Sequence, residues 1–304
     1  MSNYLCFDIS NLLFRTFYAN KSEDDVTIAG LALHQSLLTL QKYYNKYNPD
    51  KIIMAFDRSN WRVKYTESKE CISGKIYKAQ RRKNMSIREM EKYDRFKEHL
   101  STFEEIMTRY TSVVCLAADG LEADDLIGGF CQQYASKDNH ITIISTDKDF
   151  IQLLGLPNVK LVEPAKGENR TLSEWNNSAE LFMFEKIFRG DAGDNVQSAY
   201  PRIRKTRILK AWNDPIELVN IKQEEFTDHR GVTIKVKDIL KENELLMDLS
   251  KQPTHIRKLI KDTITTEMNN PGTYSFFEFL QFLGKYKMKK LTNNIETFAK
   301  MLSS

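Results

Sequence analysis

Short apolar runs alternate with longer amphipathic segments over the first half of the chain. Between the runs, residues 28–47 and 121–135 repeat apolar side chains at the spacing of one helix face. This alternation predicts an α/β fold with a doubly wound, mainly parallel sheet flanked by helices. The runs that we interpret as buried strands are residues 4–7, 51–56, 112–117, 141–145 and a weaker 159–162.

The second half of the chain has a different pattern. From about residue 178 almost every segment has helical periodicity, up to a last apolar stretch at 274–302. We therefore predict an α/β domain over residues 1–177 and a helical region over residues 178–304. A long insertion at residues 62–98 separates the second predicted strand from the third.

The insertion is strongly basic. Residues 75–97 carry nine basic side chains and three acidic ones, a net charge of +6, whereas the whole chain carries only +4. Such a segment is a candidate phosphate contact, and the alternative is a solvated basic helix. A second basic cluster contains no acid and consists of Arg202, Arg204, Lys205, Arg207 and Lys210.

Composition excludes several classes of protein. A hydrophobic content of 41% and an aromatic content of 11% exclude disorder, and only 12 Gly and 7 Pro favour long helices joined by short loops. We expect a protein of the cytoplasm, because no apolar run has the length of a membrane span and no signal peptide is recognisable. The four cysteines and five histidines are spaced unlike zinc ligands or paired thiols.

Acidic residues follow each of the first four predicted strands. Because the carboxyl ends of parallel strands meet at one edge of a sheet, we expect these side chains to converge there. Asp191 and Asp194, in the segment RGDAGDN, could close over the same edge and bring the number of acids to nine. The other seven are Asp8, Asp57, Glu122, Asp124, Asp125, Asp147 and Asp149.

Any one of these acids could instead cap a helix or form a turn, and we keep that interpretation for Asp119. Taken together, so many like charges would destabilise the fold unless cations lie among them. Oxygen ligands without His or Cys select hard ions such as Mg²⁺ or Mn²⁺, and nine carboxylates are too many for one Mg²⁺. The sequence therefore predicts a two-metal site of the kind that cleaves phosphodiesters.

Six segments, in this order, resemble one protein family: FDISNLLFRTFYA, AFD at Asp57, YKAQR at residues 77–81, GLEADDLIGG, STDKDFIQLL and GDAGDN. They are similar to the structure-specific 5′-nucleases, which include flap endonucleases and the 5′-nuclease domain of bacterial DNA polymerase I. The resemblance covers residues 4 to about 212. The last two thirds of the chain, with LKENELLMDL and KKLTNNIETF, look most like the ribonuclease H group of T-even bacteriophages, which removes RNA primers.

The resemblance implies a PIN-like nuclease core and a role for each matching residue. The acids implied at the first metal ion are Asp8, Asp57, Glu122, Asp124 and Asp125, and those nearer the second are Asp147, Asp149, Asp191 and Asp194. Tyr77, Lys78 and Arg81 fall on the family's catalytic arch, through which the 5′ strand passes. Helical periodicity separately places Lys75, Lys78 and Arg82 on one face, where with Lys83 they would contact nucleic acid.

Aromatic residues near the first predicted strand have two interpretations. Phe14, Phe17 and Tyr18 have the i, i+3, i+4 spacing of a buried helix face, but they could also form a stacking platform for a base. We keep both interpretations and count Phe17 as a candidate nucleic-acid contact.

The resemblance breaks down after GDAGDN. There the family has a glycine-rich turn that grips duplex DNA, whereas this chain has no glycine between Gly193 and Gly231 and has Ser198, Pro201 and Ile203 at the corresponding positions. We therefore expect side chains to hold the duplex in place of backbone amides. The candidates are Arg202, Arg204, Lys205 and Arg207.

These observations predict a 5′→3′ exonuclease or flap endonuclease that uses two Mg²⁺ ions, with Mn²⁺ as a substitute. As the resemblance implies, it would remove RNA primers and adjacent DNA from 5′ ends at duplex junctions during phage replication. A phosphatase with an aspartate nucleophile would need D-x-D on the first strand, where the chain has Asp8-Ile9-Ser10. The remaining alternative is a replisome adaptor that binds branched DNA without cutting it, and the retained acids argue against it.

The resemblance also implies a protein partner. The segment at residues 274–283 is more apolar than one buried helix face requires, and in the T-even group this region would dock a single-stranded-DNA-binding protein. We expect the protein to be a monomer.

Overall fold

The computed structural model describes residues 1–19 and 25–303, and its centre is a five-stranded parallel sheet. The strand order is β3-β2-β1-β4-β5, so the chain winds outward in one direction from β1 and then in the other from β4. The predicted doubly wound sheet is therefore confirmed. Its strands are β1 (Ser2–Asp8), β2 (Lys51–Ala55), β3 (Val114–Leu116), β4 (Asn139–Ile144) and β5 (Val159–Val162).

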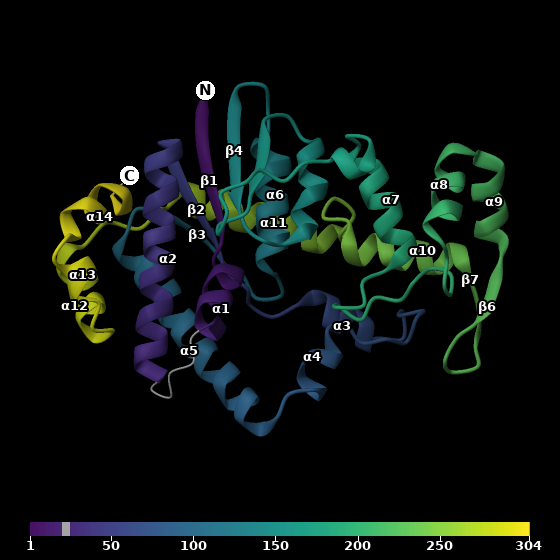
Figure 1. The fold of residues 1–304 in the computed structure, drawn as a ribbon, viewed down its shortest axis with the longest axis horizontal. Helices are drawn as coiled ribbons and strands as arrows, with labels where there is room; N and C mark the ends of the chain where they lie inside the picture. The colour runs from purple at the N-terminus through teal and green to yellow at the C-terminus, as the bar shows by residue number, and fades with distance from the viewer. Residues whose placement is uncertain (20–24, 304) are drawn as a thin grey trace.

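Alternating side chains of the strands divide the core into two layers. Leu5 and Phe7 of β1 pack on one face of the sheet, and Tyr4 and Cys6 pack on the other. Figure 1 shows helices on both faces. The first face is covered by α1 (Ile9–Ala19), α2 (Asp25–Tyr47) and α5 (Ile87–Tyr110), and the second by α6 (Ala123–Tyr134), η1 (Lys148–Gly155), α7 (Ala179–Arg189) and α11 (Thr254–Asn269).

The basic insertion contains α3 (Trp61–Glu67), α4 (Ala79–Lys83) and the first turns of α5. The prediction that Lys75, Lys78 and Arg82 share one helix face is wrong, because residues 71–78 are not helical and Lys78 has a φ of +56°. A new helix begins after Ser86, where Ser86 and Glu89 form a reciprocal capping box.

The region after residue 178 also contains strands. A short antiparallel hairpin of β6 (Glu225–Thr227) and β7 (Thr233–Lys235) interrupts the predicted helices. It packs with α8 (Lys205–Asn213), α9 (Pro215–Gln223) and α10 (Val236–Met247) around a small core of its own. Figure 1 shows this unit at the end of the molecule opposite α14.

The predicted boundary at residues 177 and 178 does not divide the core. The last helices, α12 (Phe276–Lys285), α13 (Lys289–Thr292) and α14 (Ile295–Leu302), return to the first face of the sheet beside α2 and α5. Phe279, Phe282 and Leu283 are buried there, so the C-terminal segment is part of the α/β core. None of the helices in the described residues has the length and apolar character needed to span a membrane. A short 3₁₀ helix, η2 (Ser173–Trp175), precedes α7.

Candidate metal centre and nucleic-acid cleft

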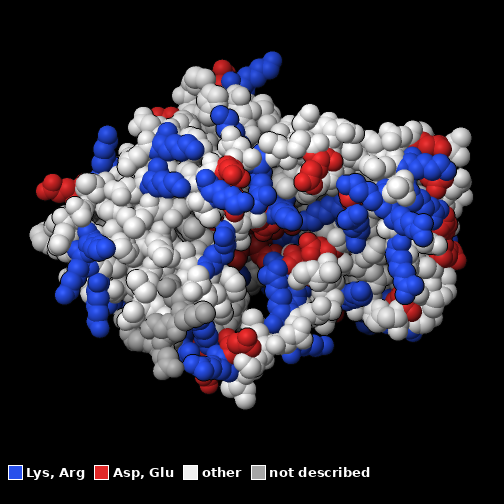
Figure 2. Space-filling model, in the orientation of Figure 1, with Lys and Arg blue, Asp and Glu red and all other residues white. Residues whose placement is uncertain are grey.

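A cleft with a volume of about 750 Å³ lies at the carboxyl ends of β1, β2 and β4, where the strand order reverses. Figure 2 shows acidic side chains inside this hollow and basic side chains along its edges. The structure places eight of the nine predicted acids on its walls. They are Asp8, Asp57, Glu122, Asp124, Asp147, Asp149, Asp191 and Asp194.

Asp8 and Asp147 are connected through one hydroxyl group. Asp8 is the last residue of β1, and its carboxylate accepts hydrogen bonds from the Asn11 backbone N–H (3.0 Å) and from Ser145 Oγ (3.1 Å). Ser145 Oγ in turn accepts a hydrogen bond from the Asp147 backbone N–H at 3.1 Å. Neighbouring strand ends therefore hold each other's acids in place.

Asp57 links the end of β2 to the start of α6. Its Oδ1 accepts a hydrogen bond from the backbone N–H of Ala123 (2.7 Å), and its own N–H donates to Ser10 Oγ (2.8 Å). A carboxylate is stabilised at a helix N-terminus, where backbone N–H groups have no partner within the helix. Glu122 and Asp124 lie in the same turn of chain, so β2 and α6 together bring three acids to the cleft.

Keeping the buried acids ionised without a bound cation costs free energy. Burial and the neighbouring Asp57 raise the pKa of Asp8 to about 8. Burial and Asp149 likewise raise the pKa of Asp147 to about 6, and burial raises the pKa of Asp124. A bound cation would relieve this penalty, and the carboxylate donors fit a hard ion such as Mg²⁺ or Mn²⁺.

Basic side chains form ion pairs with some of these acids. Lys78 Nζ lies 2.6 Å from Glu122 Oε1, and Lys186 pairs with Asp149 and lies 4.0 Å from Asp191. Within residues 1–19 and 25–303, no three acids, histidines or cysteines are grouped closely enough to hold a metal ion in this arrangement. The acids thus share the cleft, and Glu122, Asp149 and Asp194 pair there with cations of the chain.

Two residues at the cleft were missed in the sequence. Lys186 is a basic residue in the last turn of α7, just before GDAGDN, and this position was the available signal. Arg58 follows Asp57, lines the cleft and pairs with Glu104. Both lie next to a recognised motif, so a search of the flanking basic residues would have found them.

The three predicted arch residues have different positions. Lys78 and Arg81 line the cleft, and Arg81 Nη2 lies 2.5 Å from Asp194 Oδ1. Tyr77 is buried outside the cleft lining, and its hydroxyl donates to Asp194 Oδ2 at 2.8 Å. The structure therefore does not support a catalytic role for Tyr77, which instead orients Asp194. Burial opposes the charge of Asp194, but Lys78 and Arg81 outweigh it and lower its pKa.

Asp125 does not belong to the predicted metal site. Its side chain is fully buried beneath the cleft, and both of its oxygens accept hydrogen bonds from Arg62. Adjacent helix positions point in different directions, so Asp124 faces the cleft while Asp125 faces the core. The sequence motif alone could not distinguish the two.

Phe17 is also wrongly predicted as a nucleic-acid contact. It is only 1% exposed and packs against Phe96 in the first core layer. Phe14, at 38% exposure, lines the cleft with Tyr93 and Phe96. The core interpretation is correct for Phe17, and the aromatic surface available to a substrate belongs to Phe14.

The basic nucleic-acid candidates separate into two groups. Arg202 and Arg204 are exposed, and neither forms an ion pair with an acid of the described residues. In contrast, Lys205 pairs with Glu185 at 3.2 Å, and Arg207 pairs with Glu217 and Glu224. Arg207 is therefore mainly structural. In the arch, Lys75 is half-buried and Lys83 is exposed, while the side chain of Arg82 lies outside the described residues.

Residues 3–183 match the family model of the 5′-3′ exonuclease N-terminal resolvase-like domain. The chain belongs to this 5′-3′ exonuclease family. The predicted resemblance to the 5′-nucleases is therefore confirmed, and the protein is a nuclease that hydrolyses phosphodiesters.

Individual relatives agree with the family assignment. A 5′-3′ exonuclease of Buchnera aphidicola is 28% identical over 256 residues, 75% of this chain and 82% of the relative. Ribonuclease H of Enterobacteria phage T4 is 29% identical over 205 residues, 62% of each chain, which confirms the similarity to the T-even group. Among solved structures, the D15 flap endonuclease of bacteriophage T5, in a complex with DNA and metal ions, superimposes with a TM-score of 0.60. It is 19% identical and the match covers 88% of this chain and 99% of that one, so the two share a fold.

Proposed function

We propose that this protein is a divalent-metal-dependent 5′→3′ nuclease that acts as an exonuclease and flap endonuclease at duplex junctions. The observation that carries the proposal is the gathering of eight carboxylates in one cleft, with Lys78 and Arg81 on its wall. The family assignment supplies the reaction class. The T5 relative that was solved with DNA and metal ions supports the choice of substrate and cofactor.

The acids would hold two Mg²⁺ ions, for which Mn²⁺ can substitute. Asp8, Asp57, Glu122 and Asp124, all on the cleft wall, are the ligands that we propose for the first ion. Asp147, Asp149, Asp191 and Asp194, on the wall of the same cleft, are those that we propose for the second. When bound, such ions lower the pKa of the attacking water and neutralise the charge that develops on the phosphate.

The chain itself positions the substrate. Lys78 and Arg81 now pair with Glu122 and Asp194, and a phosphate entering the cleft would accept hydrogen bonds from the same two cations. Phe14 offers an exposed ring at the cleft on which a base can stack. Arg202 and Arg204 lie on the following segment and would contact the duplex backbone.

The substrate class is a 5′ end next to a duplex, as RNA primer with adjacent DNA or as a DNA flap. Similarity to the phage T4 ribonuclease H supports a role in phage replication in the cytoplasm of a bacterial host. The test is cleavage of 5′-labelled and 3′-labelled RNA-primed and flap duplexes in Mg²⁺ and in EDTA. We expect short products from the 5′ end only, and only in Mg²⁺. Tight binding without cleavage would instead favour the adaptor, and attack from the 3′ end would refute the polarity.

We further propose that α12 docks a single-stranded-DNA-binding protein while the nuclease remains a monomer. Phe277 is 75% exposed at the start of α12, beside the partly exposed Phe276, whereas Phe279 and Phe282 are core residues. Deleting the helix would therefore unfold the core, and Phe277→Ser is the better test. We expect it to abolish stimulation by that partner and to leave unstimulated cleavage unchanged. Full stimulation of the variant would refute the docking.

A further inference from the structure

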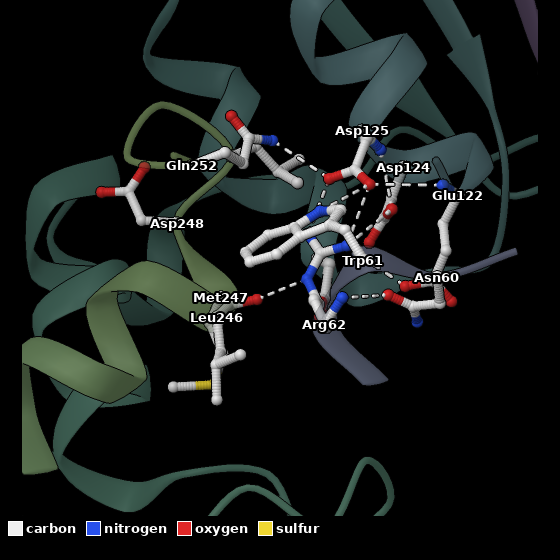
Figure 3. Close-up of polar contacts among 12 residues, drawn as sticks. Asn60, Trp61, Arg62, Glu122, Asp124, Asp125, Leu246, Met247, Asp248 and Gln252 are labelled. Carbon is white, nitrogen blue, oxygen red and sulfur yellow. Dashed lines mark hydrogen bonds and ion pairs between the residues drawn. The ribbon is translucent and has the colours of Figure 1, made fainter. Parts of the chain in front are cut away.

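Arg62 of α3 is a fully buried arginine directly beneath the acids of the cleft. Its side chain is only 1% exposed, and its guanidinium forms a bidentate salt bridge with the Asp125 carboxylate. Nη2 donates to Asp125 Oδ1 at 2.8 Å and Nη1 donates to Oδ2 at 3.0 Å. Figure 3 shows this pair between α6 and the end of α10. Burial keeps Arg62 away from any substrate, so its function must be exerted through other residues.

The same guanidinium reaches two acids of the cleft. Arg62 Nη1 donates to Glu122 Oε2 at 3.2 Å and lies 3.8 Å from Asp124 Oδ1. Asp125 Oδ2 also accepts the backbone N–H of Glu122 at 3.2 Å, which caps the start of α6. The position of the first turn of α6, which bears both cleft acids, therefore depends on Arg62 and Asp125.

On its other side Arg62 is held by a segment that we call the turn at residues 246–252, which consists of the last two residues of α10 and the turn that follows. Arg62 Nε donates to the Leu246 carbonyl at 2.7 Å, and Gln252 Nε2 donates to Asp125 Oδ1 at 3.1 Å. Trp61 Nε1 also donates to Asp125 Oδ2, at 3.2 Å. With the cleft acids on one side and this turn on the other, the guanidinium has little freedom to rotate.

The same turn is also joined to the second group of acids. Gln152 of η1 accepts a hydrogen bond from the Leu249 backbone N–H at 2.9 Å and donates to the Met247 carbonyl at 3.2 Å. Its amide also donates to the Asp149 carbonyl at 2.9 Å. The turn at residues 246–252 thus connects α6 with η1, which bear acids that we propose for different metal ions.

We propose that Arg62 is a positioning residue that holds Glu122 and Asp124 in the orientation needed for metal binding, and that the turn at residues 246–252 fixes Arg62. This inference rests on the proposed function, because it assigns those acids to a metal ion. The planar fork of arginine matches this task, since it satisfies two carboxylates and a carbonyl at fixed angles. A lysine has one nitrogen and cannot make all three contacts with that geometry.

The test compares Arg62→Gln and Arg62→Lys with the wild type in the full-length protein. Mn²⁺ binding, measured by calorimetry without nucleic acid, should weaken about 10-fold to 100-fold in Arg62→Gln, as is typical when a group supporting metal ligands is lost. Cleavage of a 5′-flap duplex in a single turnover should fall by a similar factor. Affinity for the same duplex in EDTA should stay within about threefold of the wild type, because Arg62 does not reach the surface.

Arg62→Lys separates charge from geometry. It keeps the positive charge opposite Asp125, so we expect it to recover most of the thermal stability but less of the Mn²⁺ affinity. It also keeps the test decisive if Arg62→Gln fails to fold. Full recovery of Mn²⁺ affinity in Arg62→Lys would overturn the proposal that the fork geometry matters.

Ile264→Ala is the matched control. Ile264 is buried where α11 packs against Gly129 of α6, and α11 carries none of the nine predicted acids. Its truncation lowers thermal stability through a cavity, and Mn²⁺ affinity and cleavage measured well below the midpoint should stay within about twofold. Equal loss of Mn²⁺ affinity in the control would show that Arg62 is merely structural. A wild-type protein that binds no Mn²⁺ and cleaves no flap would refute the proposed function itself.

Discussion

Lys78 Nζ lies 2.6 Å from Glu122 Oε1, while the Lys78 backbone N–H donates to the Asp194 carbonyl at 2.9 Å. The backbone of this arch residue is therefore fixed to the GDAGDN segment, and only its side chain is free to exchange a carboxylate for a phosphate. Burial opposes the charge of Lys78, but Glu122 and Asp194 outweigh it and raise its pKa. Lys78 is thus a permanent cation, suited to stabilise charge and unsuited to accept a proton.

Lys78→Met should lower the single-turnover cleavage rate about 100-fold to 1,000-fold, the usual effect of removing one group that stabilises transition-state charge. Duplex affinity should change by less than about threefold, because the interaction strengthens mainly in the transition state. Measuring both quantities on one flap duplex separates the two effects. Lys83→Met is the matched comparison within the arch: Lys83 is exposed, does not line the cleft and is a candidate nucleic-acid contact, so its loss should lower rate and affinity together. Equal losses of rate and affinity in Lys78→Met would show that Lys78 only binds the phosphate backbone of the nucleic acid and does not stabilise the transition state.

Asp124→Asn and Asp147→Asn should each lower turnover by several orders of magnitude, because each removes a charged ligand proposed for one of the two metal ions. Folding should be preserved, since both carboxyl groups are buried with a raised pKa and a neutral amide relieves the repulsion. The measurement is turnover in saturating Mg²⁺ together with circular dichroism. Asp119→Asn is the control, because Asp119 also lines the cleft but is interpreted as a turn residue. Cleavage within tenfold of the wild type in both variants would contradict the metal site.

Much of the convergence of the acids was predictable because it follows from topology: all the predicted acids except Asp191 and Asp194 come at or after the end of a parallel strand, and strand ends share an edge. The burial of Asp125 away from the cleft was not predictable. It depends on a contact with Arg62, which lies 63 residues earlier in the sequence. Phe17 and Phe14 show the same limit, because both rings contact Phe96 of α5 and equal hydrophobicity does not reveal which of them becomes fully buried. The packing of α12 in the first core layer could not be predicted from the sequence, because a helical pattern does not specify which element the helix packs against.

The metal-free protein should lose stability as the pH rises. The pKa values of Asp8 and Asp147, about 8 and about 6, lie above those of an unfolded carboxyl group, so the folded state binds these protons more tightly. The free energy of unfolding should therefore fall between about pH 4 and about pH 8. Thermal midpoints in EDTA test this directly.

Mg²⁺ should reverse the loss, and its stabilisation should grow with pH because ligands bind in the deprotonated form. Asp8→Asn is the informative variant: it should flatten the decline in EDTA and reduce the gain from Mg²⁺. A thermal midpoint in EDTA that rises steadily over this pH range would contradict the raised pKa values of these acids.

Duplex binding should depend steeply on salt through Arg202 and Arg204. Arg202 has a φ of +56°, so the turn takes the left-handed conformation favoured by glycine but with an arginine side chain. Arg202→Gly therefore removes the charge without straining the backbone. Combined with Arg204→Ala, it should reduce the log–log salt slope of binding by about 1.8, at roughly 0.9 for each lost phosphate contact.

Arg207→Ala is the control for this slope. Arg207 is paired with Glu217 and Glu224, so its loss should lower thermal stability and leave the salt slope unchanged. Exchanging K⁺ for Na⁺ at constant ionic strength should also have little effect, because side-chain cations carry the contact and a bound monovalent ion is not required. Retention of the full slope in the double variant, or specific rescue of its affinity by K⁺, would show that the backbone of this turn grips the duplex.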